Sequence, residues 1–112
     1  MKERNIDEYL MEIGREPLLS VDEERALLKA VQKKGLDCEE MKRLEKANAC
    51  FVVSLSRQYM NKGLTIWELI DIGTEGLRKA AMKYEFKADV KFISYAVWWM
   101  RQAMIQAIEE KK

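Results

Sequence analysis

The stretch from Lys91 to Glu110 limits most strongly how this chain can fold, because it runs without a glycine or a proline. Its apolar residues recur with the period of an α-helix, about 3.6 residues. One face of this helix is small and apolar and could pack on other helices; it carries Ala96, Met100, Ala103 and Ala107. The neighbouring face carries Tyr95, Trp98, Gln102 and Ile105, with Trp99 at its border. We therefore expect one long helix with two unlike faces.

The second face suits two interpretations. Nucleic-acid bases stack on flat aromatic rings, and an amide such as that of Gln102 can read the edge of a base. Lys91 and Arg101 lie near these rings in the sequence and could contact phosphates. Aromatic residues at helical spacing usually belong to a hydrophobic core, however, so Tyr95 and Trp98 could be ordinary core residues. Periodicity alone leaves the choice open.

The bulk composition is typical of one soluble, globular domain. The chain has 112 residues, of which 48% are hydrophobic and 35% charged, with one proline and five glycines. This length suffices to bury a core without metals or disulfides, and the scarcity of glycine and proline favours long helices. A net charge of +1 indicates no global affinity for nucleic acid, although a local basic patch can still bind it.

Histidine is absent, which removes the common catalytic pairs. No Ser–His or Cys–His pair can form, and no glycine-rich loop resembles a phosphate cradle. The only cysteines, Cys38 and Cys50, lack partners for a zinc site. We therefore expect no enzymatic activity, no metal and no cofactor.

The beginning of the chain has no signal-peptide pattern, and no apolar run approaches the length of a membrane span. Nothing in the sequence indicates secretion, so we do not expect a disulfide between the two cysteines. These observations predict a cytoplasmic protein in a reducing compartment, without a membrane partner.

Apolar periodicity and capping signals divide the chain into helices. We predict helices over residues 5–13, 20–34, 39–60 and 65–83, a loop over 85–91, and a final helix from Phe92. Capping boxes begin two of the helices, at Ser20–Glu23 and Thr65–Glu68, and the helix ends are marked by Gly14, Gly35 and Gly63. No segment shows the alternation of a strand. The predicted fold is all-α, a compact bundle of about four to five helices.

Two further features predict how the helices pack. The buried side of the 39–60 helix is predicted to carry Met41, Leu44, Ala47, Asn48, Phe51, Val52, Leu55 and Tyr59. Gly73 and Gly76 lie inside the 65–83 helix, where each costs about 1 kcal/mol relative to alanine. Their presence indicates close helix packing or a bend.

Basic residues surround the expected loop and final helix. Lysines and an arginine outnumber Glu85 and Asp89 there; they are Lys79, Lys83, Lys87, Lys91 and Arg101. The first three step by four residues and would share a helix face while the helix persists. Such a charge run is most often a solvated face, but beside exposed rings it would form a phosphate-attracting rim around a stacking platform.

Several segments, taken together, resemble a known protein family. They are Asn48 to Ser54, Tyr59 to Leu64, Glu68 to Ala80, and above all Lys91 to Gln102, with its Tyr-Ala-Val-Trp-Trp-Met-Arg-Gln core. This order closely resembles region 2 of bacterial RNA polymerase sigma factors of the primary, housekeeping type in the sigma-seventy family. Residues 7–19 look like region 1.2 of the same proteins, and residues 92–99 are especially similar to members from the Bacteroides group. The resemblance implies a single sigma domain over 1–112, region 1.2-like over 1–35 and region 2-like over 38–112.

The family implies promoter recognition during transcription initiation. Such domains bind the clamp helices of the largest subunit of core RNA polymerase, and then recognise and melt the minus-ten promoter element. Positions that correspond to Tyr95 and Trp98 support the melted non-template strand, from which an adenine is flipped into a pocket. Gln102 matches the residue that reads the upstream, duplex edge of the element. Region 1.2 is associated with the discriminator just downstream.

The resemblance thereby assigns two sets of residues. The DNA-binding set is Tyr84, Glu85, Lys91, Phe92, Tyr95, Trp98, Trp99, Arg101, Gln102 and Ile105, and the counterparts of the flipped-base pocket within it are Tyr84, Glu85, Lys91 and Phe92. The polymerase-binding set is Glu68, Leu69, Asp71, Ile72 and Thr74. An anti-sigma factor is a third class of partner that the resemblance leaves open.

Several positions depart from the family pattern. Cys50 replaces a usual arginine, and Ile72 replaces a usual acid within the polymerase-binding helix, which puts the strength of that interface in question. Ala88 and Asp89 replace a usual Arg-Gly, which removes a cation near the flipped-base pocket and adds a negative charge, so melting is predicted to be weaker. Ile105 replaces a small hydroxyl residue, but an apolar side chain could still contact a thymine methyl group.

Two other interpretations remain at this point. The first is a sigma-like module that binds polymerase or a regulator but has lost promoter melting, as the changes at Ala88 and Asp89 would favour. The second is an unrelated helical bundle whose aromatic residues are all core. Solvent exposure of Tyr95 and Trp98 discriminates between a DNA-binding surface and a core. Domains for the extended minus-ten and minus-thirty-five elements are missing, so we expect the chain to be a fragment.

Overall fold

Five helices make up most of residues 5–86 and 90–111, which are the residues that the structure, a computed structural model, describes. They are α1 (Ile6–Ile13), α2 (Val21–Lys34), α3 (Glu39–Arg57), α4 (Ile66–Lys83) and α5 (Phe92–Lys111). The described residues contain no strand. The predicted all-α fold and the order of its helices are therefore confirmed, and α3 ends at Arg57 rather than at residue 60.

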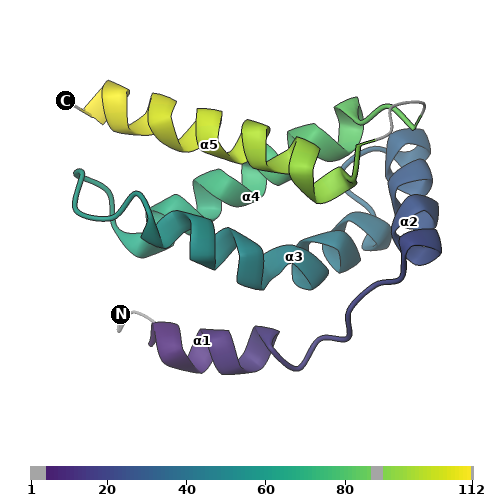
Figure 1. The fold of residues 1–112 in the computed structure, drawn as a ribbon, viewed down its shortest axis with the longest axis horizontal. Helices are drawn as coiled ribbons and strands as arrows, with labels where there is room; N and C mark the ends of the chain where they lie inside the picture. Colours follow the sequence, from purple (N-terminus) through teal and green to yellow (C-terminus); the bar gives the residue numbers. More distant parts are fainter. Residues whose placement is uncertain (1–4, 87–89, 112) are drawn as a thin grey trace.

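α3 and α4 are the central helices, α5 and α1 lie on opposite sides of them, and α2 lies across one end (Figure 1). α5 packs along α4, and this is the most extensive contact between two helices. α1 lies against α3, on the side away from α5 (Figure 1). α2 contacts α3 and α4 at the end of the bundle where α5 begins (Figure 1). The core lies between α3, α4 and α5, and α2 closes it at one end.

Both predicted capping boxes are confirmed. The Ser20 hydroxyl accepts from the Glu23 N–H at 3.1 Å, and the Glu23 carboxylate accepts from the Ser20 N–H at 3.1 Å. Thr65 and Glu68 repeat the arrangement at 3.1 and 3.0 Å. The hydrogen bonds from the backbone and side chain of the capping residue hold the pKa of Glu23 and of Glu68 below the ordinary value. These charge-assisted bonds fix where α2 and α4 begin.

The predicted buried side of α3 is only partly right. Phe51 is 39% exposed, and α3 instead buries Ala49 and Val53 beside Val52. The other predicted residues that are not fully buried are half-buried: Ala47, Asn48 and Tyr59. Phe51 lines a surface groove together with Leu18 and Ile93. The helix is covered by α1, α2 and α4 on more than one side, so its buried face is wider than a single stripe predicts.

The two glycines of α4 allow the close approach of α5, which confirms the packing interpretation. A Cβ atom at Gly76 would lie 2.8 Å from the Cα atom of Met100 and 2.9 Å from the carbonyl oxygen of Trp99. At Gly73 it would lie 2.7 Å from the terminal methyl carbon of Met104. Only a residue without a side chain lets the α5 backbone lie this close to α4.

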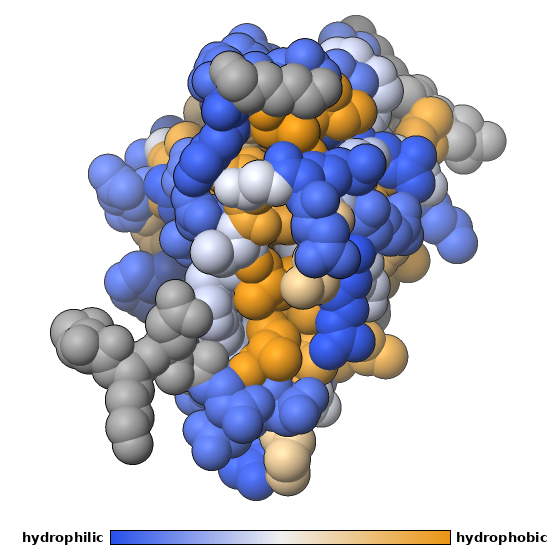
Figure 2. Space-filling view, turned by 90° about the vertical axis from the view of Figure 1, so that its left-hand side faces the viewer, coloured by the Kyte–Doolittle hydropathy of each residue, from blue (hydrophilic) through white to orange (hydrophobic). Residues whose placement is uncertain are grey.

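The end of the molecule where α5 finishes has an uneven surface. Figure 2 shows apolar surface running down the middle of this end between hydrophilic flanks. One groove of about 350 Å³ is lined there by Tyr59, Lys62, Ile105, Ile108 and Glu109. It begins beside Ile105, one of the predicted DNA-binding residues.

Candidate nucleic-acid interface

α5 buries one narrow face and leaves the other in solvent. The buried residues step by four along the helix: Phe92, Ala96, Met100, Met104 and Ile108. The predicted stripe was right at its first two residues and wrong after them, because Ala103 and Ala107 are only half-buried. The approach of α4 at Gly73 and Gly76 selects the row of residues that faces it. The opposite face is therefore free of the core.

The exposed face carries a large aromatic ring. Trp98 is 59% exposed and Ile105 is 42% exposed. Arg101 and Gln102 are exposed between them, at the three- and four-residue spacings that place side chains on one helix face. Because a core aromatic would be covered, Trp98 contradicts the interpretation in which all the rings are core.

Tyr95 and Trp99 connect this exposed ring to the core. The Tyr95 side chain is half-buried, and its hydroxyl donates to the carbonyl oxygen of Lys83 at 3.2 Å. The Tyr95 and Trp99 rings meet edge-on at 6.3 Å between centroids, and Trp99 meets Trp98 at 5.4 Å. The buried indole nitrogen of Trp99 has no hydrogen-bond partner among the described residues. The exposed tryptophan is thus one of three rings in contact, Tyr95, Trp99 and Trp98, rather than an isolated side chain.

Two residues of the predicted flipped-base pocket belong to the core in this structure. Tyr84 is 8% exposed and Phe92 is 1% exposed, and their rings contact each other edge-on at 5.5 Å. The Tyr84 hydroxyl donates to the carbonyl oxygen of Val90. These side chains support the surface rather than form it, because the hydrophobic cluster beneath α5 covers them. Glu85 and Lys91, which are next to Tyr84 and Phe92 in the sequence, are exposed.

The basic rim is only partly described. Lys79, Lys83, Lys91 and Arg101 are exposed, and Lys79 and Lys83 share a face of α4 as predicted. The helix ends at Lys83, as predicted, so the shared face is limited to these two lysines. Lys87 and the family-divergent Ala88 and Asp89 lie outside the described residues.

The predicted polymerase-binding residues of α4 separate into exposed and covered ones. Glu68 and Asp71 are exposed and Thr74 is half-buried, with its hydroxyl donating to the carbonyl oxygen of Ile70 at 2.8 Å. Ile72 is half-buried against the core cluster, and Leu69 is completely buried. Leu69 therefore positions the helix in this structure and does not offer its side chain to a partner.

Arg78 was missed by sequence reasoning. Its guanidinium group is paired with three carboxylates, from Glu45 at 3.3 Å, Glu75 at 3.5 Å and Asp37 at 3.7 Å. It follows Asp71 and Thr74 at spacings of seven and four residues, which place it on their face of α4. In the sequence, only the three-residue spacing from Glu75 to Arg78 indicates an ion pair. The other two partners, Glu45 of α3 and Asp37 before α3, are brought to Arg78 only by the fold.

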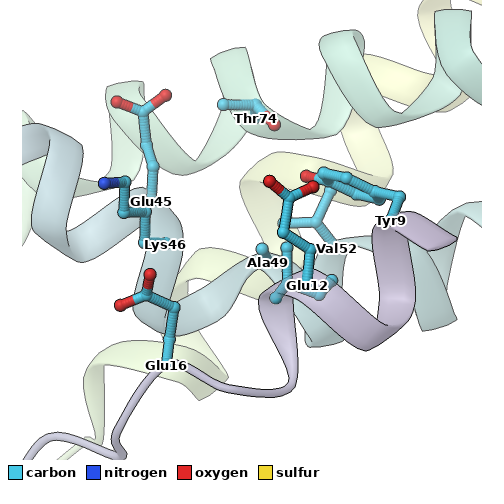
Figure 3. A pocket seen from close by; sticks show the side chains of 9 residues that line it. Tyr9, Glu12, Glu16, Glu45, Lys46, Ala49, Val52 and Thr74 are labelled. Atoms are coloured by element: carbon cyan, nitrogen blue, oxygen red, sulfur yellow. The ribbon is translucent and has the colours of Figure 1, made fainter. Parts of the chain in front are cut away.

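A shallow cavity of about 290 Å³ separates α1 from α3 and α4. Its floor includes Ala49 and Val52, and the carboxylates of Glu12, Glu16 and Glu45 stand around it (Figure 3). Tyr9 closes one side from α1. The cavity shows that α1 covers α3 incompletely, next to Thr74 of α4.

Two negative observations apply to residues 5–86 and 90–111. None of the helices there combines the length and the apolar character that a membrane crossing requires. No three His, Cys, Asp or Glu side chains in the same residues are grouped in a way that could hold a metal ion. Both cysteines are free thiols, with Cys38 half-buried and Cys50 exposed.

Family models match most of the chain. A model of Sigma-70 region 2 matches residues 45–112, which include α4, α5 and most of α3, and a model of Sigma-70 factor region 1.2 matches residues 6–35. The chain belongs to the sigma-70 family. The resemblance that its sequence indicated is therefore confirmed at the level of the family.

Individual relatives of the sigma-70 family agree. The chain is 44% identical over 103 residues to the RNA polymerase sigma factor SigA of Listeria monocytogenes, a match that covers 92% of this chain and 27% of the relative. It is 43% identical over 103 residues to SigA of Clostridium acetobutylicum and 42% identical over 104 residues to SigA of Lactococcus lactis, with the same coverage. The chain thus spans about a quarter of the length of these relatives. The predicted similarity to the Bacteroides group stays a prediction.

Proposed function

We propose that this chain is the promoter-recognition domain of an RNA polymerase sigma factor, which binds core polymerase and the minus-ten promoter element during transcription initiation. The observation that carries the proposal is the exposed Trp98, held on a rigid helix between Tyr95 and Arg101. A sigma-70 family member has a use for such a ring on its region 2 surface, since bases of a melted strand can stack on it. The proposal places the chain beside polymerase in the bacterial cytoplasm.

The residues of α5 divide by chemistry. Tyr95 and Trp98 stack on bases of the non-template strand, with Trp99 behind them. Gln102 and Ile105 face the upstream, duplex part of the element, through an amide and an apolar contact. Arg101 and Lys91 neutralise phosphates, while Glu85 lies at the edge of the flipped-base pocket that Tyr84 and Phe92 support from the core. Flipping a base costs a few kcal/mol, and each stacked base returns about 1–3 kcal/mol.

The second surface is the outer face of α4. Glu68 and Asp71 are exposed there and Thr74 is half-buried, and we propose that the three residues meet the clamp helices of the largest polymerase subunit. Ile72 adds a half-buried apolar contact where the family usually has an acid, and Leu69 holds the helix from below. The division of the domain into residues 1–35 and 38–112 belongs to the same proposal, and no observation adds an anti-sigma factor to it.

Binding to a single-stranded oligonucleotide that carries a minus-ten non-template sequence tests the DNA surface. Trp98→Ala is expected to weaken binding about tenfold or more, because it removes a stacking ring that contributes little to the core. Met11→Ala is the matched control, since Met11 is an exposed apolar residue (67%) on α1, which contacts α3 and not α5. Equal affinity for minus-ten and scrambled strands, unchanged by Trp98→Ala or Tyr95→Ala, would refute the proposal.

The salt dependence of the same binding separates phosphate contacts from stacking. Arg101→Ala should lower the slope of log affinity against log salt by about 0.7, the value for one phosphate contact on single-stranded DNA. Trp98→Ala should leave the slope unchanged. On α4, Asp71→Ala should reduce capture by the isolated clamp segment, and indifference to that change would count against the assigned polymerase face.

A further inference from the structure

The C-terminus of α4 lacks the usual means of satisfying its last carbonyl groups. The helix ends at Lys83, and the next residue, Tyr84, has an extended conformation with φ −62° and ψ 133°. A helix commonly ends in a left-handed glycine that ties back its final carbonyls, and here no such residue follows. Other parts of the chain must therefore supply the donors.

Gln32 of α2 supplies two of them. Its side-chain nitrogen donates to the carbonyl oxygen of Ala81 at 3.0 Å and to that of Tyr84 at 2.9 Å. A neutral amide nitrogen carries two hydrogens, so both are used. The side chain is half-buried, and the two carbonyls lie on either side of the helix end. One residue of α2 thus caps α4 from outside.

Two cations of α2 hold the next turn of chain. The guanidinium carbon of Arg25 lies 5.3 Å from the centre of the Phe86 ring, and the Lys29 ammonium lies 5.6 Å from it. Phe86 in turn meets the Tyr84 ring edge-on at 5.2 Å. α2 therefore contacts the residues that follow α4 through hydrogen bonds and through cation–π contacts.

The same helix end carries the stacking platform. The Tyr95 hydroxyl donates to the carbonyl oxygen of Lys83, between the two carbonyls that Gln32 binds. The Tyr84 ring lies 5.7 Å from that of Tyr95, and contacts continue from Tyr95 through Trp99 to Trp98. A shift of the α4 terminus would move the phenol that is bonded to it, and then the rings in contact with the phenol.

We propose that Gln32 is a positioning residue for strand recognition: by capping α4, it fixes Tyr95 and Trp98 in the geometry that bases stack on. Its effect on DNA binding rests on the function proposed above, whereas its effect on the rings does not. α2 packs against α3 and α4 and not against α5. In this proposal it therefore acts on the DNA surface without contacting DNA.

Three variants of this chain test the proposal. Gln32→Met keeps the length of the side chain and removes both N–H groups. Gln32→Arg restores N–H donors and places a cation at a helix C-terminus, where it is favourable. Gln58→Met makes the same chemical change at an exposed glutamine after α3. Each variant is measured by the indole N–H resonances of Trp98 and Trp99, by affinity for the minus-ten strand, and by affinity for the clamp segment.

The expected result for Gln32→Met is a shift of the indole resonances and about tenfold weaker strand binding, with clamp binding unchanged. Gln32→Arg should restore both, and Gln58→Met should change neither. Unshifted resonances with unchanged strand affinity would overturn the proposal. So would a parallel loss of strand and clamp affinity that Gln32→Arg does not restore, because that pattern is general destabilisation. If the unmodified chain fails to bind the strand, the proposed function fails, and the indole shift alone then decides whether Gln32 positions the rings.

Discussion

The α4–α5 pair and α1 are attached to the same bundle in opposite ways. α5 lies so close to α4 that a methyl group at Gly76 would meet its backbone, and α5 buries a residue in every turn. α1 buries no residue completely and is held by half-buried side chains, among them Tyr9, whose ring meets Trp67 of α4 edge-on at 5.2 Å. The difference indicates that α5 is held by rigid packing, whereas α1 should separate from the bundle at lower cost.

The largest expected effect concerns the rigid pair. Gly76→Ala should destabilise the fold by about 2 kcal/mol. The added methyl group would push the α5 backbone away from α4, and the free energy lost in this contact should exceed the gain in helix propensity. Gly73→Ala is the matched comparison: its methyl group would meet only side chains, the flexible end of Met104 at 2.7 Å and a methyl group of Val52 at 3.0 Å, so its cost should be smaller. Urea unfolding measures both. Equal costs for the two glycines would contradict the view that backbone contact at Gly76 sets the spacing.

A smaller effect is expected where α1 is attached. Tyr9→Ala should lower the stability of the α1 attachment by about 1–2 kcal/mol, since it removes an aromatic pair and some apolar contact. Hydrogen exchange should speed up in α1 and stay unchanged in α5. Glu8→Ala, an exposed change on the same helix, is the control. Slower opening of α1 than of α5 in the unmodified chain would reverse the comparison.

Acid should loosen the beginnings of α2 and α4 before it affects the α4–α5 contact. The pKa of Glu23 and of Glu68 is lowered by hydrogen bonds from Ser20 and Thr65, so their stabilising effect is complete above the ordinary value of 4.5. It is lost as the pH falls through the lowered values. Urea unfolding from pH 7 to pH 3 should show this decline, and Glu68→Gln should flatten it. A decline unaffected by Glu68→Gln would place the acid sensitivity elsewhere.

The smallest effect is expected at Glu24 of α2. Burial raises the pKa of this carboxyl, and no hydrogen bond or ion pair to it occurs within the described parts of the chain. The ionised form is therefore disfavoured in the fold, and Glu24→Gln should raise the Tm slightly at pH 7. The gain should vanish as the pH falls through the raised pKa. Asp22→Asn, in the same first turn but exposed, should give no gain, and an equal gain there would exclude burial as the cause.

Local signals in the sequence predicted well where the helices lie, but they predicted less well which residues of each helix are buried. Ser20–Glu23 and Thr65–Glu68 are complete within four residues, so their capping geometry needs no tertiary information. Phe51 was misplaced because a single apolar stripe cannot indicate that several neighbours cover α3. Ala103 and Ala107 were preferred over Met104 and Ile108 because periodicity tolerates a shift of one residue, which only the contact with α4 resolves.

The sequence by itself determined the all-α class, the limits of most helices and, through the segment from Lys91 to Gln102, the sigma-70 family. Only the tertiary structure decided that Trp98 is exposed while Tyr84, Phe92 and Leu69 are buried, and that Gln32 caps a helix 49 residues away. The physical reason is range. Capping and periodicity act within one or two turns, whereas exposure and long-range hydrogen bonds depend on which helix lies against which.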